Sequence, residues 1–118
     1  MDTVLVIDDD PDILDALQFV LLDAGYNVVA TQFGEDAEKL IHAKQLPKLI
    51  ILDILLSGKD GRDVTKILKT HKKTKDIPII LISAQPDIKK SAIDAGADAF
   101  IAKPFDIQSL LTEVATHV

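Results

Sequence analysis

Carboxylates follow two apolar runs of the sequence, in positions from which they could hold a hard divalent cation together. Asp8 and Asp9 follow the run Val4–Ile7, and Asp53 follows the run Leu49–Leu52. Continuous apolar runs of this length are typical of strands buried on both faces of a sheet. Carboxylates gathered at the ends of such strands repel one another. Mg²⁺, which binds oxygen ligands and needs few of them from protein, would relieve that repulsion.

Two further apolar segments end on a hydroxyl and an ammonium group. Ser83 follows Ile79–Ile82, and Lys103 follows Ala99–Ala102 and precedes Pro104. Alone, a serine at a strand end more often bonds to backbone, and a lysine there is more often a surface charge. Together with the carboxylates they complete a set that suits phosphoryl transfer. That reaction is catalysed mainly by positioning and charge neutralisation, and a carboxylate can be its nucleophile.

The segments that deliver these side chains alternate along the chain between strand-like and helix-like patterns. The predicted strands cover residues 3–8, 27–31, 48–53, 79–83 and 99–102. The predicted helices cover residues 11–24, 34–43, 61–70, 87–95 and 107–118. Alternating strands and helices form a parallel sheet with helices on both faces, joined by right-handed crossovers. The carboxyl ends of the strands then share one edge, where ligands collect in such folds.

Signals at the helix ends support these bounds. Asp10 is expected to cap the first helix ahead of Pro11, and Gly25 to end it in the left-handed conformation. Asp106 is expected to cap the last helix. The apolar residues expected to face inward are Ile13, Leu14, Leu17, Val20, Leu21, Ala24, Ala37, Leu40, Ile41, Val64, Ile67, Leu68, Ile107, Leu110, Leu111, Val114 and Val118.

The composition fits one domain with its own core. The chain has 118 residues, 47% of them hydrophobic, and no cysteine, which excludes disulfides, thiol catalysis and zinc–thiolate sites. The formal net charge is −6. Residues 1–60 carry 12 acidic and 4 basic side chains, against 7 and 9 in residues 61–118. An acidic chain is a poor general binder of nucleic acid, and the basic segment Lys66–Lys75 is expected to be a solvated helix end and loop.

The sequence carries no targeting signal that we recognise. Its start, Met1-Asp2-Thr3, lacks the basic segment of a signal peptide. No apolar run approaches the roughly 20 residues that cross a membrane, so we expect a cytoplasmic location and no membrane contact. The histidines at positions 42, 71 and 117 are expected to be surface residues, because nothing pairs them as a metal site or a catalytic base.

The ordered set of polar residues resembles the response-regulator receiver domain of two-component signalling. The resemblance covers residues 1–118 and rests on Asp8-Asp9, Asp53, Ser83-Ala84 and Lys103-Pro104. Asp53 lies 44 residues after Asp9, and Ser83 lies 30 residues after Asp53, which agrees with that family. The resemblance implies a flavodoxin-like, doubly wound (βα)5 fold with five parallel strands in the order 2-1-3-4-5. Within that family, the chain is similar to the stand-alone regulators of chemotaxis.

The resemblance also implies how the acidic residues act. Asp53 would accept a phosphoryl group from a histidine of a sensor kinase. Asp9 and Asp53 would bind Mg²⁺ directly, Asp8 would bind it through a water molecule, and the backbone carbonyl of Leu55 would be a third protein ligand. The chain would catalyse only its own phosphorylation and dephosphorylation, and would not be an enzyme in the wider sense.

The remaining residues of the set would act on the phosphoryl group and transmit its arrival. Lys103 would balance its charge, Ser83 would donate a hydrogen bond to it, and the small Ala84 would leave the acceptor accessible. Phe100 would change orientation with Ser83 and so switch a surface formed by the fourth helix, the fifth strand and the fifth helix. The peptide bond before Pro104 would be cis, a form that only proline makes accessible.

The implied partners follow from this role. They are a sensor histidine kinase or phosphotransfer protein, and a downstream target protein or an effector domain outside this sequence. Dimerisation on phosphorylation is implied as well, and direct binding of nucleic acid is not. One position departs from the family, because Ser57-Gly58 replaces a usual proline, which would loosen the loop after Asp53. Leu55 and Gln85 lie where the family tunes its rate of dephosphorylation.

Three alternatives remain open on the residues alone. A phosphohydrolase with an Asp nucleophile would carry Asp-x-Asp after its first strand, whereas here Ile54-Leu55 follow Asp53 on the third strand. A flavodoxin-type binder would need a phosphate loop rich in Ser, Thr and Gly, where this chain has acids that repel phosphate. An adaptor with the same fold that is never phosphorylated is the third alternative, and the intact acid set argues against it.

Overall fold

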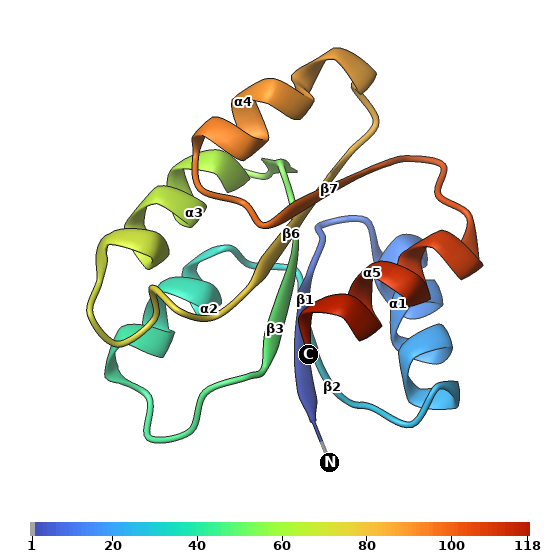
Figure 1. Cartoon of the computed structure of the whole chain (residues 1–118), viewed down its shortest axis with the longest axis horizontal. Coiled ribbons are helices and arrows are strands. Elements are labelled where there is room, and N and C mark those ends of the chain that lie inside the picture. The colour runs from blue at the N-terminus through green and yellow to red at the C-terminus, as the bar shows by residue number, and fades with distance from the viewer. Residues whose placement is uncertain (1) are drawn as a thin grey trace.

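Five parallel strands form the central sheet (Figure 1). A computed structural model describes residues 2–118, apart from the side chain of Pro86. The strands are β1 (Thr3–Ile7), β2 (Asn27–Thr31), β3 (Leu49–Asp53), β6 (Ile79–Ser83) and β7 (Ala99–Ala102), in the order β2-β1-β3-β6-β7. This confirms the flavodoxin-like order 2-1-3-4-5. Every residue of β3 and β6 is buried, which is why these strands read as unbroken apolar runs.

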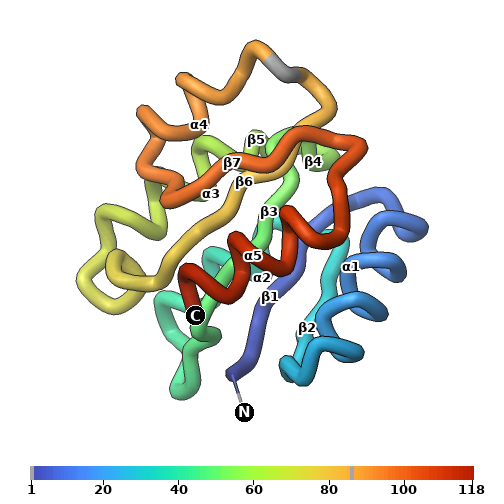
Figure 2. Tube along the Cα trace, turned by 45° about the vertical axis from the view of Figure 1, so that its right-hand side comes forward, coloured from blue at the N-terminus to red at the C-terminus, as the bar shows by residue number. Residues whose placement is uncertain are grey.

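Helices cover both faces of this sheet. α1 (Pro11–Asp23) and α5 (Ile107–His117) lie on one face, and α2 (Glu35–Glu38), α3 (Gly61–Thr70) and α4 (Lys89–Asp94) lie on the other (Figure 1 and Figure 2). Each face has its own apolar core. The helices contribute Leu14, Leu17, Leu21, Leu110 and Val114 to the first core, and Ala37, Val64, Leu68 and Ala92 to the second.

The caps expected at the helix ends are present, and Asp10 and Asp106 lie in loops at the carboxyl edge of the sheet. The Asp10 side chain accepts a hydrogen bond from the backbone of Asp12, and the Asp106 side chain accepts one from the backbone of Ser109. Gly25 follows α1 with a φ of +99°. Because only three residues separate β1 from α1, the cap of α1 fixes the short loop that carries the first acids.

Two helices are shorter than predicted, and one small element is missed. Residues 39–42 form the 3₁₀ segment η1 (Lys39–His42) after α2, and η2 (Pro86–Ile88) precedes α4. Such tight turns are common at helix ends, and apolar periodicity does not distinguish them from α-helix. The loop after β3 forms a hairpin of β4 (Leu55–Leu56) with β5 (Lys59–Asp60), too short to leave a pattern in the sequence.

Four apolar residues expected to face inward are exposed instead. They are Ala24, Ile67, Ile107 and Val118. In α3, Thr65 takes a buried position because its hydroxyl donates to the Gly61 carbonyl (2.8 Å), and Ile67, 41% exposed, falls outside the buried stripe. The other three lie at or beside helix ends, outside the stretches that pack on the sheet.

Candidate functional site

Three carboxylates meet at the carboxyl edge of the sheet. Asp53 is the last residue of β3, and Asp8 and Asp9 follow the neighbouring strand β1 directly. One oxygen from each of the three carboxylates lies within 4.8 Å of the others. Asp8 is fully buried, Asp53 is 5% exposed and Asp9 is partly buried. The structure thus brings together the three acids that the sequence suggests as a cation site.

Lys103 reaches the same point from the end of β7. Its Nζ lies 2.9 Å from Oδ2 of Asp8 and 3.2 Å from Oδ2 of Asp53. The backbone N–H of Lys103 donates to the carbonyl of Ser83 (2.8 Å), which holds the lysine beside β6. The peptide bond from Lys103 to Pro104 is cis, as predicted.

Both carboxylate oxygens of Asp8 have a neighbour that holds the side chain in place. Oδ1 accepts a hydrogen bond from the backbone N–H of Asp10 (2.9 Å). Oδ2 is buried and faces the Lys103 ammonium, yet it accepts no aligned hydrogen bond. A buried carboxylate oxygen without such a bond is costly, so this atom would gain from a cation or a cation-bound water nearby.

The ionisation of the site reflects burial and mutual repulsion. Burial first, and then the charge of Asp8, raise the pKa of Asp53 to about 6, although Lys103 and the backbone of Leu55 act in the opposite direction. Burial lowers the pKa of Lys103. Its contacts with Asp8 and Asp53 outweigh that effect, so the pKa of Lys103 lies above its usual value. At neutral pH the Asp53 carboxylate is therefore mostly ionised beside the Lys103 ammonium.

The residues present fit a magnesium ion. At their formal charges, three carboxylates and one ammonium leave an excess of two negative charges, which a divalent cation would cancel. All three donors are oxygens, the ligand type that Mg²⁺ prefers. Oδ2 of Asp8, now paired with Lys103 without an aligned hydrogen bond, would gain a second neighbour of opposite charge. The donor set and its charge thus agree with the Mg²⁺ site expected from the sequence.

The other residues of the predicted set lie around the cluster. Ser83 is buried at the end of β6, where its Oγ accepts a hydrogen bond from the backbone of Gln85 (3.0 Å), and Ala84 beside it is exposed. Leu55 begins β4 with its side chain 51% exposed. Phe100 is not brought to the carboxylates. It lies partly buried on β7 and packs against the core under α2, α3 and α4.

Two residues near the cluster have contacts that sequence reasoning misses. Ser57 donates a hydrogen bond from Oγ to Oδ2 of Asp9 (3.1 Å). Gly61 begins α3 so close to β3 that an added Cβ would lie 2.4 Å from the carbonyl oxygen of Asp53. Glycine is costly within a helix, so its presence at the first helical position is a signal that could have identified Gly61. The contact of Ser57 leaves no such signal.

A comparison with protein families settles which kind of site this is. The profile described as the response regulator receiver domain matches residues 4–115. The chain belongs to this family. Receivers of this family accept a phosphoryl group on an aspartate, so the match favours a receiver over the phosphohydrolase and flavodoxin-type alternatives.

The individual proteins that are similar to this receiver include several response regulators. The DNA-binding dual master transcriptional regulator RpaA of Synechocystis sp. is 38% identical over 116 residues, which are 97% of this chain and 48% of RpaA. TrrA of Thermotoga maritima, solved in complex with Mg²⁺-BeF, is 32% identical with a TM-score of 0.88, and all of both chains is covered. The chemotaxis response regulator CheY4 of Vibrio cholerae is 27% identical with a TM-score of 0.89, covering 100% of this chain and 99% of that one.

The remaining expectations concern partners and location. This receiver spans about half the length of RpaA, whose name describes it as DNA-binding, so the absence of nucleic-acid binding stays a prediction. In residues 2–118, no helix has the length and apolar character that a membrane crossing requires. The three histidines lie on η1, just after α3 and on α5, and none of them belongs to the acidic cluster.

Proposed function

We propose that residues 1–118 form one receiver domain that is phosphorylated on Asp53 by a histidine phosphodonor, with Mg²⁺ as cofactor. The proposed partners are a sensor histidine kinase or phosphotransfer protein and, downstream, a target protein or effector domain in the cytoplasm. The observation that carries the proposal is the convergence of Asp8, Asp9 and Asp53 within 4.8 Å, with the Lys103 ammonium 3.2 Å from Asp53.

Asp53 would act as the nucleophile of the transfer. One of its carboxylate oxygens forms the new bond to phosphorus, while the bond from phosphorus to the donor nitrogen breaks and its electron pair stays on the nitrogen. With a pKa of about 6, Asp53 is mostly ionised at neutral pH and so is competent for attack. Lys103, held next to it, can pair with the charge of the incoming phosphoryl oxygens.

The acidic side chains would divide the work of holding the ion. Asp9 and Asp53 would be direct ligands together with the carbonyl of Leu55. Asp8, whose oxygens already face the Asp10 backbone and Lys103, would act through a water molecule. When bound, Mg²⁺ would neutralise charge on the phosphoryl oxygens. The protein's own part is to place these ligands on two buried strands before the donor arrives.

The face formed by α4, β7 and α5 would carry the signal, because α4 is weakly held. Of its six residues only Ala92 is buried. Arg62 on α3 holds α4 through a hydrogen bond from Nη1 to Oγ of Ser91 (2.9 Å). The Ser83 hydroxyl now accepts the Gln85 N–H just before η2. Its movement toward a phosphoryl oxygen would release the segment that leads into α4.

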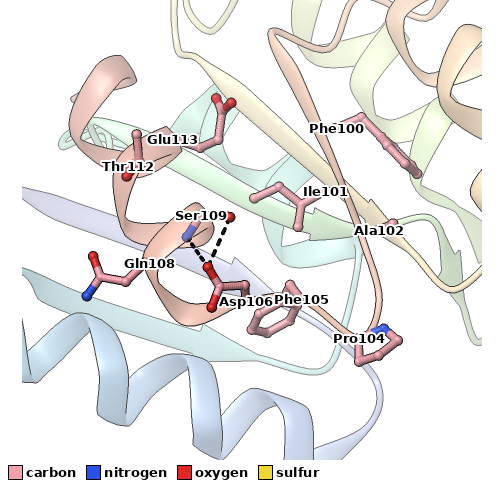
Figure 3. Close-up of a pocket in the computed structure, with 10 residues that line it drawn as sticks. All are labelled: Phe100, Ile101, Ala102, Pro104, Phe105, Asp106, Gln108, Ser109, Thr112 and Glu113. Carbon is pink, nitrogen blue, oxygen red and sulfur yellow. Dashed lines mark hydrogen bonds between the residues drawn. The ribbon is translucent and has the colours of Figure 1, made fainter.

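A cavity on this face offers a place for a side chain of the partner. It has a volume of about 530 Å³ and lies between β7 and α5 (Figure 3). Phe100, Phe105 and Thr112 are among the residues that line it. The Phe100 side chain points away from α5 (Figure 3) and packs against the core under α2, α3 and α4, so a change in its orientation would alter the packing on that face of the sheet.

Chemical phosphorylation tests the acceptor directly. Incubation with acetyl phosphate and Mg²⁺, followed by mass spectrometry under mild conditions, should add one phosphoryl group to the wild type and none to Asp53→Asn. Lys103→Ala should label more slowly, because the charge of the incoming group is no longer balanced. Asp15→Asn, which removes an exposed carboxylate on α1, should label at the wild-type rate.

Two outcomes would contradict the proposal. Label that persists on Asp53→Asn would place the acceptor elsewhere. A folded wild-type chain that takes no label from acetyl phosphate or from a kinase would favour the adaptor that is never phosphorylated.

A further inference from the structure

The loop after β3 reaches back to the loop after β1 through a single side chain. Ser57 donates from Oγ to Oδ2 of Asp9 across 48 residues of sequence, at 3.1 Å. We infer that Ser57 is a positioning residue for the magnesium site, because its hydroxyl orients the Asp9 carboxylate for the ion. The inference rests on the proposed function and adds a residue to which that function assigns no part.

The hairpin holds Ser57 at a fixed place. Leu55 pairs with Asp60 and Leu56 pairs with Lys59, and the turn between them is Ser57-Gly58, with a φ of +73° at the glycine. The Leu56 side chain is 8% exposed. Lys59 makes an ion pair with Glu38, the last residue of α2 (2.6 Å). The loop is therefore a paired hairpin with contacts from both of its strands.

The hydroxyl acts on a carboxylate whose nearest charged neighbours include two of its own sign. Asp9 lies beside the carboxylates of Asp8 and Asp53, and their repulsion favours rotation of its side chain away from the cluster. A hydrogen bond on Oδ2 opposes that rotation. A carboxylate has about four lone-pair sites on its two oxygens, so one accepted hydrogen bond leaves capacity for an ion.

Ser57 also connects two segments that would each supply a ligand. Asp9 comes from the loop after β1, and the carbonyl of Leu55 comes from the hairpin that carries Ser57. Some residues do not bind a metal themselves but donate a hydrogen bond to one of its ligands. Removal of such a hydrogen bond typically weakens metal affinity by about 10- to 100-fold. A proline at position 57 has no hydroxyl to donate. This contact is therefore a property of the present chain and not of the usual residue at that position.

Calorimetric titration of the full chain with MgCl₂ tests the role of the hydroxyl. Ser57→Ala should weaken Mg²⁺ affinity by about tenfold or more. Ser57→Thr, which keeps the hydroxyl, should retain most of the wild-type affinity. Ser109→Ala is the matched control, because it also removes a 3.1 Å bond from a hydroxyl to a carboxylate, that of Asp106 at the start of α5. It should leave Mg²⁺ affinity unchanged, and urea unfolding in EDTA would verify that all variants fold.

Each other outcome has a definite meaning. Wild-type affinity in Ser57→Ala would overturn the inference and leave the proposed Mg²⁺ site intact. Tighter binding would also overturn it, because the hydroxyl would then compete with the ion. Equal losses in Ser57→Ala and Ser57→Thr would assign the effect to the turn and not to the hydroxyl. Absence of saturable binding by the folded wild type would refute the proposed function itself.

Discussion

Asp53→Asn should stabilise the metal-free protein at neutral pH. Burial and the neighbouring Asp8 raise the pKa of Asp53 from 3.8 to about 6. The folded chain thus binds the Asp53 proton more tightly than the unfolded chain does. The contribution of this carboxyl group to stability is therefore fully present below about pH 4 and is lost as the pH rises through about 6. Asparagine is uncharged, like the protonated carboxyl group. Asp53→Asn therefore keeps its folding stability at a pH where ionisation of Asp53 destabilises the wild type.

The size of the effect follows from the same shift. Each pKa unit corresponds to about 1.4 kcal/mol, so a shift of about two units costs the ionised protein about 3 kcal/mol well above pH 6, to order of magnitude. Part of that cost is already present at about pH 4.5, where the unfolded carboxyl has ionised. Between about pH 4.5 and pH 8, the stability advantage of Asp53→Asn should grow by about 2 kcal/mol.

Urea unfolding followed by circular dichroism, in EDTA, would measure this difference across the pH range. Asp15→Asn controls for the loss of one negative charge from an acidic chain, since Asp15 is exposed on α1. Saturating Mg²⁺ should then stabilise the wild type more than Asp53→Asn. An advantage that stays constant with pH, or that grows equally in Asp15→Asn, would refute the reasoning from burial and repulsion.

Mg²⁺ at about a hundredfold excess over its dissociation constant should stabilise the wild type by about 2.7 kcal/mol, seen as a rise in melting temperature that Asp9→Ala largely loses. An equal rise in both would remove Asp9 from the ligand set. Beryllofluoride, a phosphoryl mimic, should with Mg²⁺ change amide exchange in residues 85–96 and 99–103. Changes confined to the neighbours of Asp53 would mean that the face of α4, β7 and α5 does not carry the signal.

The strands could be predicted closely because burial leaves a direct record in the sequence. β6 is buried throughout, and its predicted bounds 79–83 are confirmed. The bounds 27–31 and 99–102 are also confirmed, although β2 and β7 are partly exposed strands at the edges of the sheet. β1 and β3 are each one residue shorter than predicted. The order of the strands came from the family resemblance, and it is this order that places the ends of β1 and β3 side by side. Residues 39–42 and the β4–β5 hairpin were missed because short turns have no periodicity.

The site could be predicted as a set of residues, but its contacts could not. Each acid was identified by its place at the end of a strand. The sequence gives no measure of how far Lys103 reaches, and it contacts both Asp8 and Asp53. Ser57 meets Asp9 only because a hairpin turns back toward another loop. Contacts between loops depend on backbone geometry that neither composition nor spacing records.

The sheet suggests why a phosphoryl group on Asp53 would be sensed on one face of the protein. The two groups that would contact its oxygens, Ser83 and Lys103, end adjacent strands, and the backbone N–H of Lys103 donates to the Ser83 carbonyl. Ser83 leads into η2 and α4, whereas Lys103 leads through Pro104 into α5. Movement of either side chain toward a phosphoryl oxygen would therefore act near the start of α4 or α5, the two helices of the face formed by α4, β7 and α5. Typical coupling energies are about 1–3 kcal/mol, and a shift of α4 would disturb few buried contacts because Ala92 is its one buried residue.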